Sequence, residues 1–322
     1  MWQPDRVVRG PRPLLESEIG PLNRLFADAF TDRYRKDGLV GVRVPQLNPD
    51  VWRYALRDAG EGALAWADER GDLIAFNVAH HSGVEGWMGP LAVRPDRQGL
   101  GLGKAIIQAA VEWLVEHGVR VIGLETMPRT VENIGFYSGL GFSPGYLTVT
   151  LTGDVQQRAV RGRFLRLSEL PPKERLAWFG RCRQTLDALL PGYDFTRELE
   201  LTAQLALGDT VVIASDGALA AFALYHSVPL ADQRGGDELR VLKLYAESAD
   251  AFDRLIVALE SCAAKLKLRR VAVRCQTVYR DAYRALIQRG YRVRWTDLRM
   301  CLEGYEEPVA GHGVVLLSNW EI

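Results

Sequence analysis

Cysteine is scarce in this 322-residue chain, and its distribution argues against metal or redox chemistry. The four cysteines, Cys182, Cys262, Cys275 and Cys301, all lie in the second half, and no two of them form a Cys-x-x-Cys pair. Zinc and thiol-redox sites commonly use such closely spaced pairs. We therefore expect no bound metal, and we expect the reduced thiols that are usual in a cytoplasmic protein.

Long apolar runs and an excess of one charge are absent as well. No stretch approaches the roughly 20 apolar residues that a membrane helix needs, and residues 1–13 carry several charges where a signal peptide has its apolar core. Forty basic residues balance forty acidic ones, so we expect neither nucleic acid nor a membrane as a partner. The length predicts about two domains, in a monomer or a homodimer.

A weak internal repeat indicates how these domains are arranged. The segment 71–82 resembles 216–227, so that Phe222 follows Phe76, and His226 follows His80, by 146 positions. Later, residues 140–142 parallel residues 289–291 at an offset of 149. Matches in the same order at nearly the same offset predict two copies of one domain. We place the first copy at residues 1–152, a polar, glycine-bounded linker at 153–162, and the second copy at 163–322.

Hydrophobic periodicity predicts a mixed α/β fold for each copy. In the first copy, helices near residues 17–30 and 49–58 precede three apolar runs, at 63–67, 73–79 and 87–93, which are typical of an antiparallel meander. A helix then leads to a strand at 119–126, a helix at 130–140 and a closing strand. The second copy repeats this order and adds an apolar run at 313–320, which we expect to pair back onto the first copy. The fold class is thus α/β (α+β), with a mostly antiparallel sheet, one parallel pair of strands and helices on both faces in each copy.

The strongest local signal is a glycine-rich turn between a strand and a helix. The strand Leu91-Ala92-Val93 runs into Arg97-Gln98-Gly99-Leu100-Gly101-Leu102-Gly103-Lys104. Glycines at every second position allow positive φ and expose backbone N–H groups at a helix N-terminus, which attracts phosphate. Arg97 and Lys104 add positive charge at the rim.

Several kinds of turn can look like this. A Walker loop requires glycine five residues before Gly103, where Gln98 stands, so that pattern fails. A dinucleotide-binding turn has the spacing GxGxxG after a first parallel strand, with an acid such as Glu125 about 20 residues on. This loop has the spacing GxGxG after an antiparallel meander. A tight turn without a ligand remains an alternative.

The same residues resemble the acyl-CoA-binding motif of the GNAT N-acetyltransferase superfamily, Arg/Gln-x-x-Gly-x-Gly/Ala, which Gln98, Gly101 and Gly103 fill. Leu91-Ala92-Val93 resembles the family's splayed strand, whose backbone pairs with the pantetheine arm. Phe136-Tyr137-Ser138-Gly139-Leu140-Gly141-Phe142 resembles the family's Phe-Tyr-x-x-x-Gly-Phe ending. The resemblance covers residues 7–151, the whole first copy.

This resemblance implies direct transfer of an acetyl group from acetyl-CoA to the primary amine of a small molecule. Tyr137 matches the tyrosine that protonates the departing sulfur. The family's glutamate position is taken by Trp87, which cannot accept a proton. Glu85, on the same strand face, and His81 are therefore the candidate bases, with a chain of water molecules as the alternative to either. Asn133 is a further candidate for cofactor contact. His80 repeats as His226 in the second copy, which favours a structural role for it.

The second copy lacks this machinery, because its corresponding helix starts at Glu247-Ser248-Ala249-Asp250 without glycine and Leu286 stands at the tyrosine position. Negative charges there would repel a pyrophosphate. We interpret this copy as a degenerate GNAT-like domain. Two other hypotheses stay open for the chain: a non-catalytic acyl-CoA-binding module, and an acyltransferase that uses a longer acyl-CoA.

Overall fold

The computed structural model describes residues 7–156, 163–215, 217–232 and 236–320. Residues 157–162, which form most of the predicted linker, lie outside these ranges. The boundaries of the two copies therefore stay a prediction, and "first copy" and "second copy" are used below for the two halves of the sequence.

The elements of the first copy follow the predicted order. Its second helix shows how local sequence sets a boundary: the Asn48 side chain accepts a 3.0 Å hydrogen bond from the Asp50 N–H, and Pro49 occupies the first turn. The elements are β1 (Arg9–Pro13), α1 (Ile19–Lys36), α2 (Pro49–Ala59), β2 (Ala63–Ala67), β3 (Leu73–Ser82), β4 (Glu85–Val93), α3 (Leu102–Glu116), β5 (Val121–Thr126), α4 (Val131–Ser138) and β6 (Phe142–Asp154).

The second copy repeats this series and adds one strand. Its elements are β7 (Phe164–Arg166), α5 (Pro172–Leu189), α6 (Thr196–Gln204), β8 (Gly208–Ser215), β9 (Ala218–His226), β10 (Glu238–Ala246), α7 (Ala249–Lys265), β11 (Arg270–Gln276), α8 (Arg280–Gln288), β12 (Arg292–Leu302) and β13 (Val315–Ser318). The pairs β4–β5 and β10–β11 are parallel, and each is joined through a helix, α3 or α7. The predicted fold class is thus confirmed.

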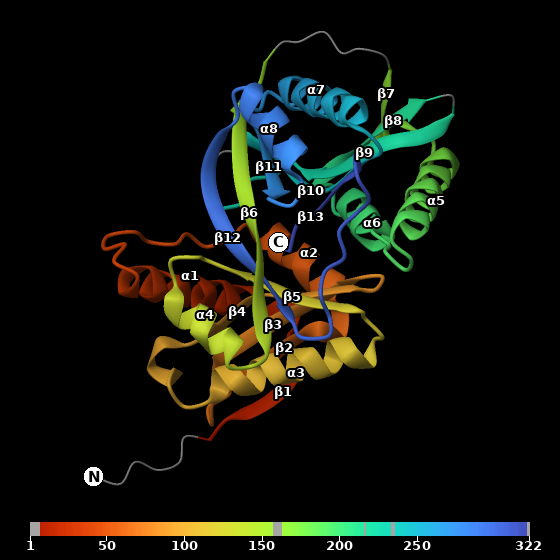
Figure 1. Cartoon of the computed structure of the whole chain (residues 1–322). Helices are drawn as coiled ribbons and strands as arrows, with labels where there is room; N and C mark the ends of the chain where they lie inside the picture. Colours follow the sequence, from red (N-terminus) through yellow and green to blue (C-terminus); the bar gives the residue numbers. More distant parts are fainter. Residues whose placement is uncertain (1–6, 157–162, 216, 233–235, 321–322) are drawn as a thin grey trace, which may run out of the picture.

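The closing strands of the two copies are exchanged within one continuous sheet. The strand order is β1-β2-β3-β4-β5-β12-β6-β11-β10-β9-β8-β7, with β13 beside β10. β12 of the second copy therefore pairs with β5 of the first, and β6 of the first copy pairs with β11 of the second. In Figure 1, β6 and β12 run as two long neighbouring strands that connect the lower half of the molecule to the upper half. The sequence repeat predicts two copies but not this exchange.

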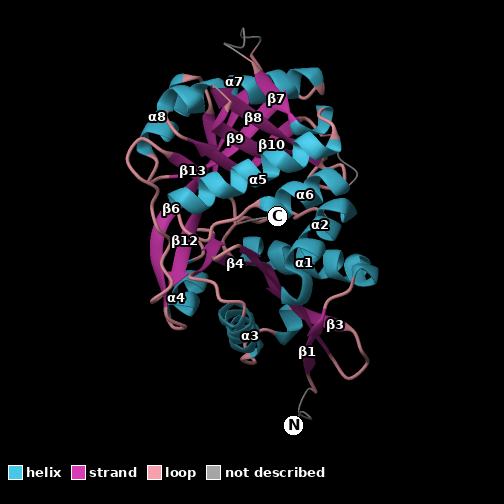
Figure 2. Ribbon diagram, turned by 90° about the vertical axis from the view of Figure 1, so that its right-hand side faces the viewer, coloured by secondary structure: helices cyan, strands magenta, loops and turns pink. Residues whose placement is uncertain are grey.

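Helices cover both faces of the first copy's strands. On one face, α3 and α4 share an apolar core with Met88 and Leu124, and on the other α1 and α2 pack against Phe76. The two copies meet where α2 contacts α6, as Figure 2 shows between the upper and lower halves. There the Tyr54 ring meets the His226 ring edge-on, with centroids 4.7 Å apart. The face of β4 and β5 opposite α3 is thereby turned toward the second copy.

The additional strand does not pair as the sequence led us to expect. β13 runs antiparallel to β10 of its own copy, with Lys243 opposite Ser318 and Ala246 opposite Val315. The expectation that this run pairs with a strand of the first copy was wrong. Val315 and Leu317 pack into the core of the second copy, whereas Leu316 and Trp320 pack into a core that includes Trp87 of the first copy.

Candidate active site

The parallel strands β4 and β5 stay paired over four residues and then diverge. Their register runs from Glu85 opposite Val121 to Met88 opposite Leu124 and ends there. At this point β4 carries a bulge, because residues 89 and 90 have only Val78 opposite them on β3. We call the divergence beyond Met88 and Leu124 the wedge. Residues 91–93 stay bonded to β3, and their other backbone edge has no strand partner within the described residues.

The predicted glycine-rich loop lies at the end of this unpaired edge and has the expected backbone geometry. Gly99 and Gly101 have φ of 76° and 80°, and Gly101 is the N-cap of α3. Within the part of the chain that the structure describes, the backbone N–H groups of residues 99–103 donate to no other backbone group. A Cβ on Gly103 would lie 3.3 Å from the Phe136 ring, which brings α4 close to the loop. This arrangement is a nest of N–H donors at a helix N-terminus, suited to an anion.

The three polar side chains of the loop, Gln98, Arg97 and Lys104, lie in different surroundings. The Gln98 side chain donates to the Val93 carbonyl at 3.1 Å and accepts from Lys36 Nζ at 2.8 Å, so it ties the loop to β4 and α1. The expectation that Arg97 lies at the rim of the loop was wrong: Arg97 is buried, and its guanidinium lies 3.6 Å from the Asp68 carboxylate. Lys104 is exposed on the first turn of α3. Sequence reasoning missed Lys36, because nothing in the sequence brings the end of α1 to the loop.

Tyr137 and Asn133 lie on α4, which covers the wedge from the α3 side. Tyr137 is buried in the same apolar cluster as Met88 and Leu124, the last paired residues of β4 and β5. Burial raises the pKa of Tyr137 to about 12, so the phenol keeps its proton at neutral pH. The Asn133 amide is 3.5 Å from Thr126 Oγ1, at the end of β5. Both predicted residues thus flank the wedge.

Glu85 lies on the opposite face of the sheet, toward the second copy. It is fully buried, and it accepts hydrogen bonds from Ser318 Oγ at 2.6 Å and from Trp320 Nε1 at 3.0 Å. Lys243 Nζ lies 3.7 Å from Glu85. Three residues from the second half of the sequence therefore hold this candidate base, a relationship that no pattern in the sequence indicates.

His81 faces the α3 side of β3, near the end of α3 that is far from the glycine loop. Its ring centroid is 5.7 Å from those of Trp113 and His117. Burial, assisted by His117, lowers the pKa of His81, although a hydrogen bond to the Gly83 carbonyl opposes the shift. The imidazole is thus neutral at pH 7 and able to accept a proton. The structure does not bring His81 and Glu85 together.

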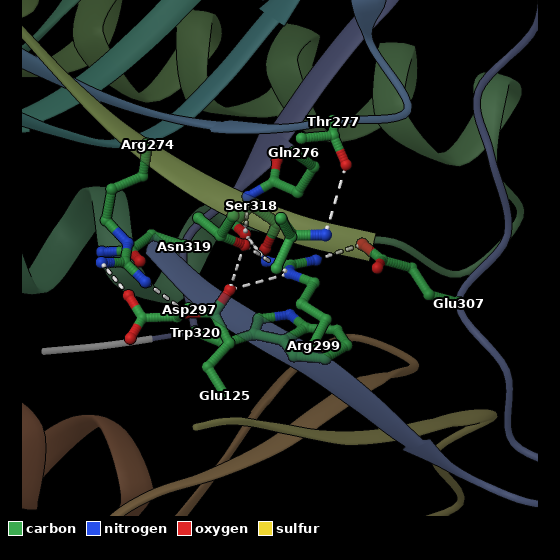
Figure 3. A network of polar contacts seen from close by, with 12 residues as sticks. Glu125, Arg274, Gln276, Thr277, Asp297, Arg299, Glu307, Ser318, Asn319 and Trp320 are labelled. Carbon is green, nitrogen blue, oxygen red and sulfur yellow. Dashed lines mark hydrogen bonds and ion pairs between the residues drawn. The ribbon is translucent and has the colours of Figure 1, made fainter. Parts of the chain in front are cut away.

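A second buried polar network lies next to Glu85, around Glu125 of β5 (Figure 3). Arg299 of β12 donates to Glu125 at 2.9 Å, and Arg274 of β11 forms ion pairs with Glu125 and, at 3.1 Å, with Asp297. Burial acts to raise the pKa of Glu125, but the charges of Arg274 and Arg299 outweigh it and hold that pKa below its ordinary value. The Arg299 guanidinium also lies 3.8 Å from the centroid of the Trp320 ring.

His80 and His226 occupy matching places, at the ends of β3 and β9. His80 Nδ1 is 2.6 Å from Asp58 of α2, and His226 Nε2 is 3.0 Å from Thr202 of α6. Each imidazole thus joins a strand to the helix that precedes it in its own copy. This parallel supports the structural role expected for His80.

Two further properties concern membranes and metals. Among the residues described, no helix combines the length and apolar character that crossing a membrane requires. The same ranges hold no group of three or more His, Cys, Asp or Glu side chains suited to bind a metal ion.

Comparison with solved structures shows that this fold is shared over nearly the whole chain. A GCN5-related N-acetyltransferase from Sphaerobacter thermophilus superposes with a TM-score of 0.59 over 96% of this chain and 98% of its own, at 15% identity. A tandem GNAT protein from the clavulanic acid biosynthesis pathway superposes with a TM-score of 0.61 over 94% of this chain and 100% of its own, at 13% identity. At such identities these likenesses establish the fold alone.

Sequence comparison identifies the first half more closely. Residues 23–142 match the family model of the acetyltransferase (GNAT) family. Serotonin N-acetyltransferase 2, chloroplastic, from Oryza sativa subsp. japonica is 33% identical over 127 residues, which are 39% of this chain and 56% of the rice protein. Residues 23–142 therefore carry the match to the GNAT acetyltransferase family, and the chain as a whole shares its fold with a tandem GNAT protein.

Proposed function

We propose that the chain is an acetyl-CoA-dependent N-acetyltransferase that acts on a primary amine of a small molecule. The observation that carries this proposal is the nest of N–H groups at residues 99–103, which opens onto the unpaired edge of residues 91–93. The nest would take the pyrophosphate, with Lys104 at its rim. The amides of the pantetheine arm would pair with the β4 edge, which brings the thioester to the wedge.

The reaction that fits this placement is direct acyl transfer. The amine loses a proton, its nitrogen attacks the acetyl carbonyl carbon, and the C–S bond breaks as the tetrahedral intermediate collapses. The departing thiolate takes a proton from Tyr137, whose raised pKa keeps the phenol protonated until that moment. The products are an N-acetyl amine and CoA; the base then releases the amine proton to solvent, and the Tyr137 phenolate takes up one proton from solvent, so that the protons balance.

The base that receives the amine proton has two candidates on opposite faces of the sheet. Glu85 faces the second copy, but its oxygens accept hydrogen bonds from Ser318 and Trp320. His81 is half-buried and neutral but lies on the α3 side. Glu85→Gln and His81→Gln, compared by kcat/KM for the amine against pH, separate them, because only loss of the base removes the acid limb of the profile.

The acceptor is proposed from the sequence relative. The similarity of this chain to a serotonin N-acetyltransferase over 127 residues makes arylalkyl amines the first compounds to test. The even charge balance of the chain, forty basic and forty acidic residues, gives no general attraction to highly basic acceptors. A panel that ranges from arylalkyl to aliphatic amines, with acetyl-CoA and longer acyl-CoA donors, covers the open alternatives.

Calorimetric titration with acetyl-CoA tests the carrying observation. Gly103→Glu puts a carboxylate into the nest and should weaken acetyl-CoA binding by at least ~100-fold, through charge repulsion and steric exclusion. Ala249→Glu is the matched control, because it adds the same charge at the exposed start of α7 in the second copy. Equal affinity in the two variants, with circular dichroism unchanged, would contradict the proposal. Tight binding without turnover of any amine would favour the non-catalytic acyl-CoA-binding alternative.

A further inference from the structure

The second copy contains a wedge that matches the first. Strands β10 and β11 are parallel from Glu238 opposite Arg270 to Val241 opposite Val273, which again makes four pairs. Directly afterwards β10 has a bulge, because its register with β9 shifts between Val241 and Lys243. The divergence beyond Val241 and Val273 is the second wedge. Its geometry corresponds, step by step, to the place proposed for the acyl-CoA arm in the first copy.

The second wedge is filled by the chain itself. β13 pairs antiparallel with β10 beyond the bulge, from Lys243 opposite Ser318 to Ala246 opposite Val315. On the other side, the Gln276 side chain, at the end of β11, donates to the Ser318 carbonyl at 3.3 Å. A peptide strand therefore occupies the edge of β10 that corresponds to the unpaired edge of β4.

Apolar side chains on both faces hold this strand in place. Val315 and Leu317 pack into the core beneath α7, whereas Leu316 and Trp320 pack into the core between the copies. All four are at least 90% buried. Because burial of apolar side chains is the main favourable term in such contacts, we expect the segment to be bound firmly.

The start of α7, which corresponds to the glycine-rich loop of the first copy, is not suited to bind phosphate. Helix α7 begins after Ser248, whose hydroxyl accepts a 3.2 Å hydrogen bond from the Ala251 N–H, and Asp250 lies in its first turn. The Ser248 side chain thus caps the start of α7, and Asp250 gives that end of the helix a negative charge. Leu286, at the position that corresponds to Tyr137, is buried in an apolar core.

We propose that the second wedge is a peptide-binding site whose ligand is the chain's own C-terminal segment, Val315–Trp320, and that the chain in consequence binds one acyl-CoA, in the first copy. The number of acyl-CoA molecules rests on the proposed function; the occupation of the second wedge does not. The chemistry is strand addition, in which backbone hydrogen bonds supply affinity and alternate side chains supply fit. Pantetheine, with its two amides, offers the same kind of backbone partner.

The segment also reaches the first copy. After β13, the Asn319 N–H donates to the Leu242 carbonyl at 2.9 Å, and Trp320 comes to lie on Gly123 of β5 and beside Glu85 of β4. Glu85 and Gly123 lie on the two strands that form the first wedge. When the C-terminal segment occupies the second wedge, the indole of Trp320 therefore lies against Glu85, the candidate catalytic base of the first copy.

Hydrogen exchange of the wild-type protein with and without acetyl-CoA, together with calorimetry, tests this proposal. We expect one binding site per chain, slow exchange in residues 243–246 and 315–318 already without ligand, and no change there when acetyl-CoA binds. Residues 91–93 should exchange at least ~10-fold more slowly with ligand, because their amides gain partners. Two sites per chain, or faster exchange of residues 315–318 when acetyl-CoA binds, would overturn the proposal. Absence of binding would overturn the proposed function, while exchange in residues 315–318 would still test the occupant.

A variant examines the peptide site itself. Leu317→Asp puts a charge into an apolar core and should release β13, so that exchange in residues 243–246 rises at least ~10-fold. Val309→Asp, at a 45% exposed position in the same C-terminal region, is the control. A synthetic peptide of residues 313–322, added in excess to the Leu317→Asp protein, should restore slow exchange, and the same peptide with the Leu317→Asp change should not. No effect of either peptide on a folded, fast-exchanging variant would contradict a peptide-binding wedge; if the variant does not fold, the wild-type measurements decide.

Discussion

The indole N–H of Trp320 donates a 3.0 Å hydrogen bond to Oε1 of Glu85, across 235 positions of the sequence. Ser318, two residues earlier, donates to the other oxygen of the same carboxylate at 2.6 Å. The candidate base of the first copy is thus oriented by the segment that fills the wedge of the second copy. The two copies are joined at this point as well as through the exchanged strands β6 and β12.

Removal of the Tyr137 hydroxyl should slow the chemical step and leave donor binding intact. We expect Tyr137→Phe to lower kcat by ~10–100-fold, because the thiolate then leaves without a positioned acid. The Kd for acetyl-CoA should change by less than about threefold, since the ring remains in its apolar cluster. Steady-state kinetics and calorimetry measure the two quantities. Tyr146→Phe, at a 40% exposed tyrosine on β6, is the control, and an unchanged kcat in Tyr137→Phe would show that Tyr137 is not the acid.

Ionisation of Tyr137 should not lower kcat on the alkaline side of the pH profile. Burial raises the pKa of Tyr137 to about 12, and the active form is the protonated phenol, which persists below that value. With the amine saturating, we expect kcat not to fall between pH 7 and 10 through loss of this proton. A fall within that range which disappears in Tyr137→Phe would contradict the assignment.

Gly123 should tolerate no side chain while Trp320 is in place. A Cβ at Gly123 would lie 2.1 Å from the Trp320 ring, so Gly123→Ala must displace the indole. We expect Gly123→Ala to lower the free energy of unfolding by ~1–3 kcal/mol, the usual cost of overpacking. Chemical denaturation measures this change.

The control for this prediction is another glycine of the first copy. Beyond the backbone of its own helix, a Cβ at Gly135 in α4 would meet no atom of the described residues within 4 Å. Gly135→Ala should therefore be neutral or should stabilise by up to about 1 kcal/mol, through helix propensity. In the double variant Gly123→Ala with Trp320→Leu, the smaller side chain should recover part of the loss. Equal effects of Gly123→Ala and Gly135→Ala would contradict the close approach of Trp320.

The buried carboxylate Glu198, on α6, should make stability depend on pH near neutrality. Burial raises the pKa of Glu198 to about 7, although the nearby charge of Lys243 opposes the shift. The folded protein therefore keeps a proton that the unfolded chain has released. This contribution to stability is fully present below the ordinary value of 4.5 and is lost as the pH rises through 7.

We expect wild-type protein to lose more stability between pH 5 and 8 than Glu198→Gln, whose amide does not titrate. Urea denaturation at both pH values measures the difference. Glu174→Gln, at an exposed position on α5, is the control and should follow the wild type. A wild-type loss of stability equal to that of Glu198→Gln would show that Glu198 titrates at its ordinary pKa.

The sequence by itself determined the helices, the strands and the glycine-rich loop. Apolar periodicity located the helix at 49–58 to within one residue and the strand at 63–67 with the bounds that the structure has, because short-range interactions set them. The positive φ of Gly99 and Gly101 follows from local turn chemistry in the same way. The weak repeat at an offset of 146 residues was sufficient to predict two copies.

Only the tertiary structure decided which strands and side chains of the two copies lie together. The exchange of β6 and β12, the insertion of β13 into the second wedge, and the contacts of Glu85 with Lys243, Ser318 and Trp320 depend on pairings that the linear order does not specify. Strand pairing uses backbone groups that nearly all residue types share, so no local pattern in the sequence indicates which partner is chosen. Burial of a carboxylate depends on what covers it, and here that cover comes from the opposite half of the chain.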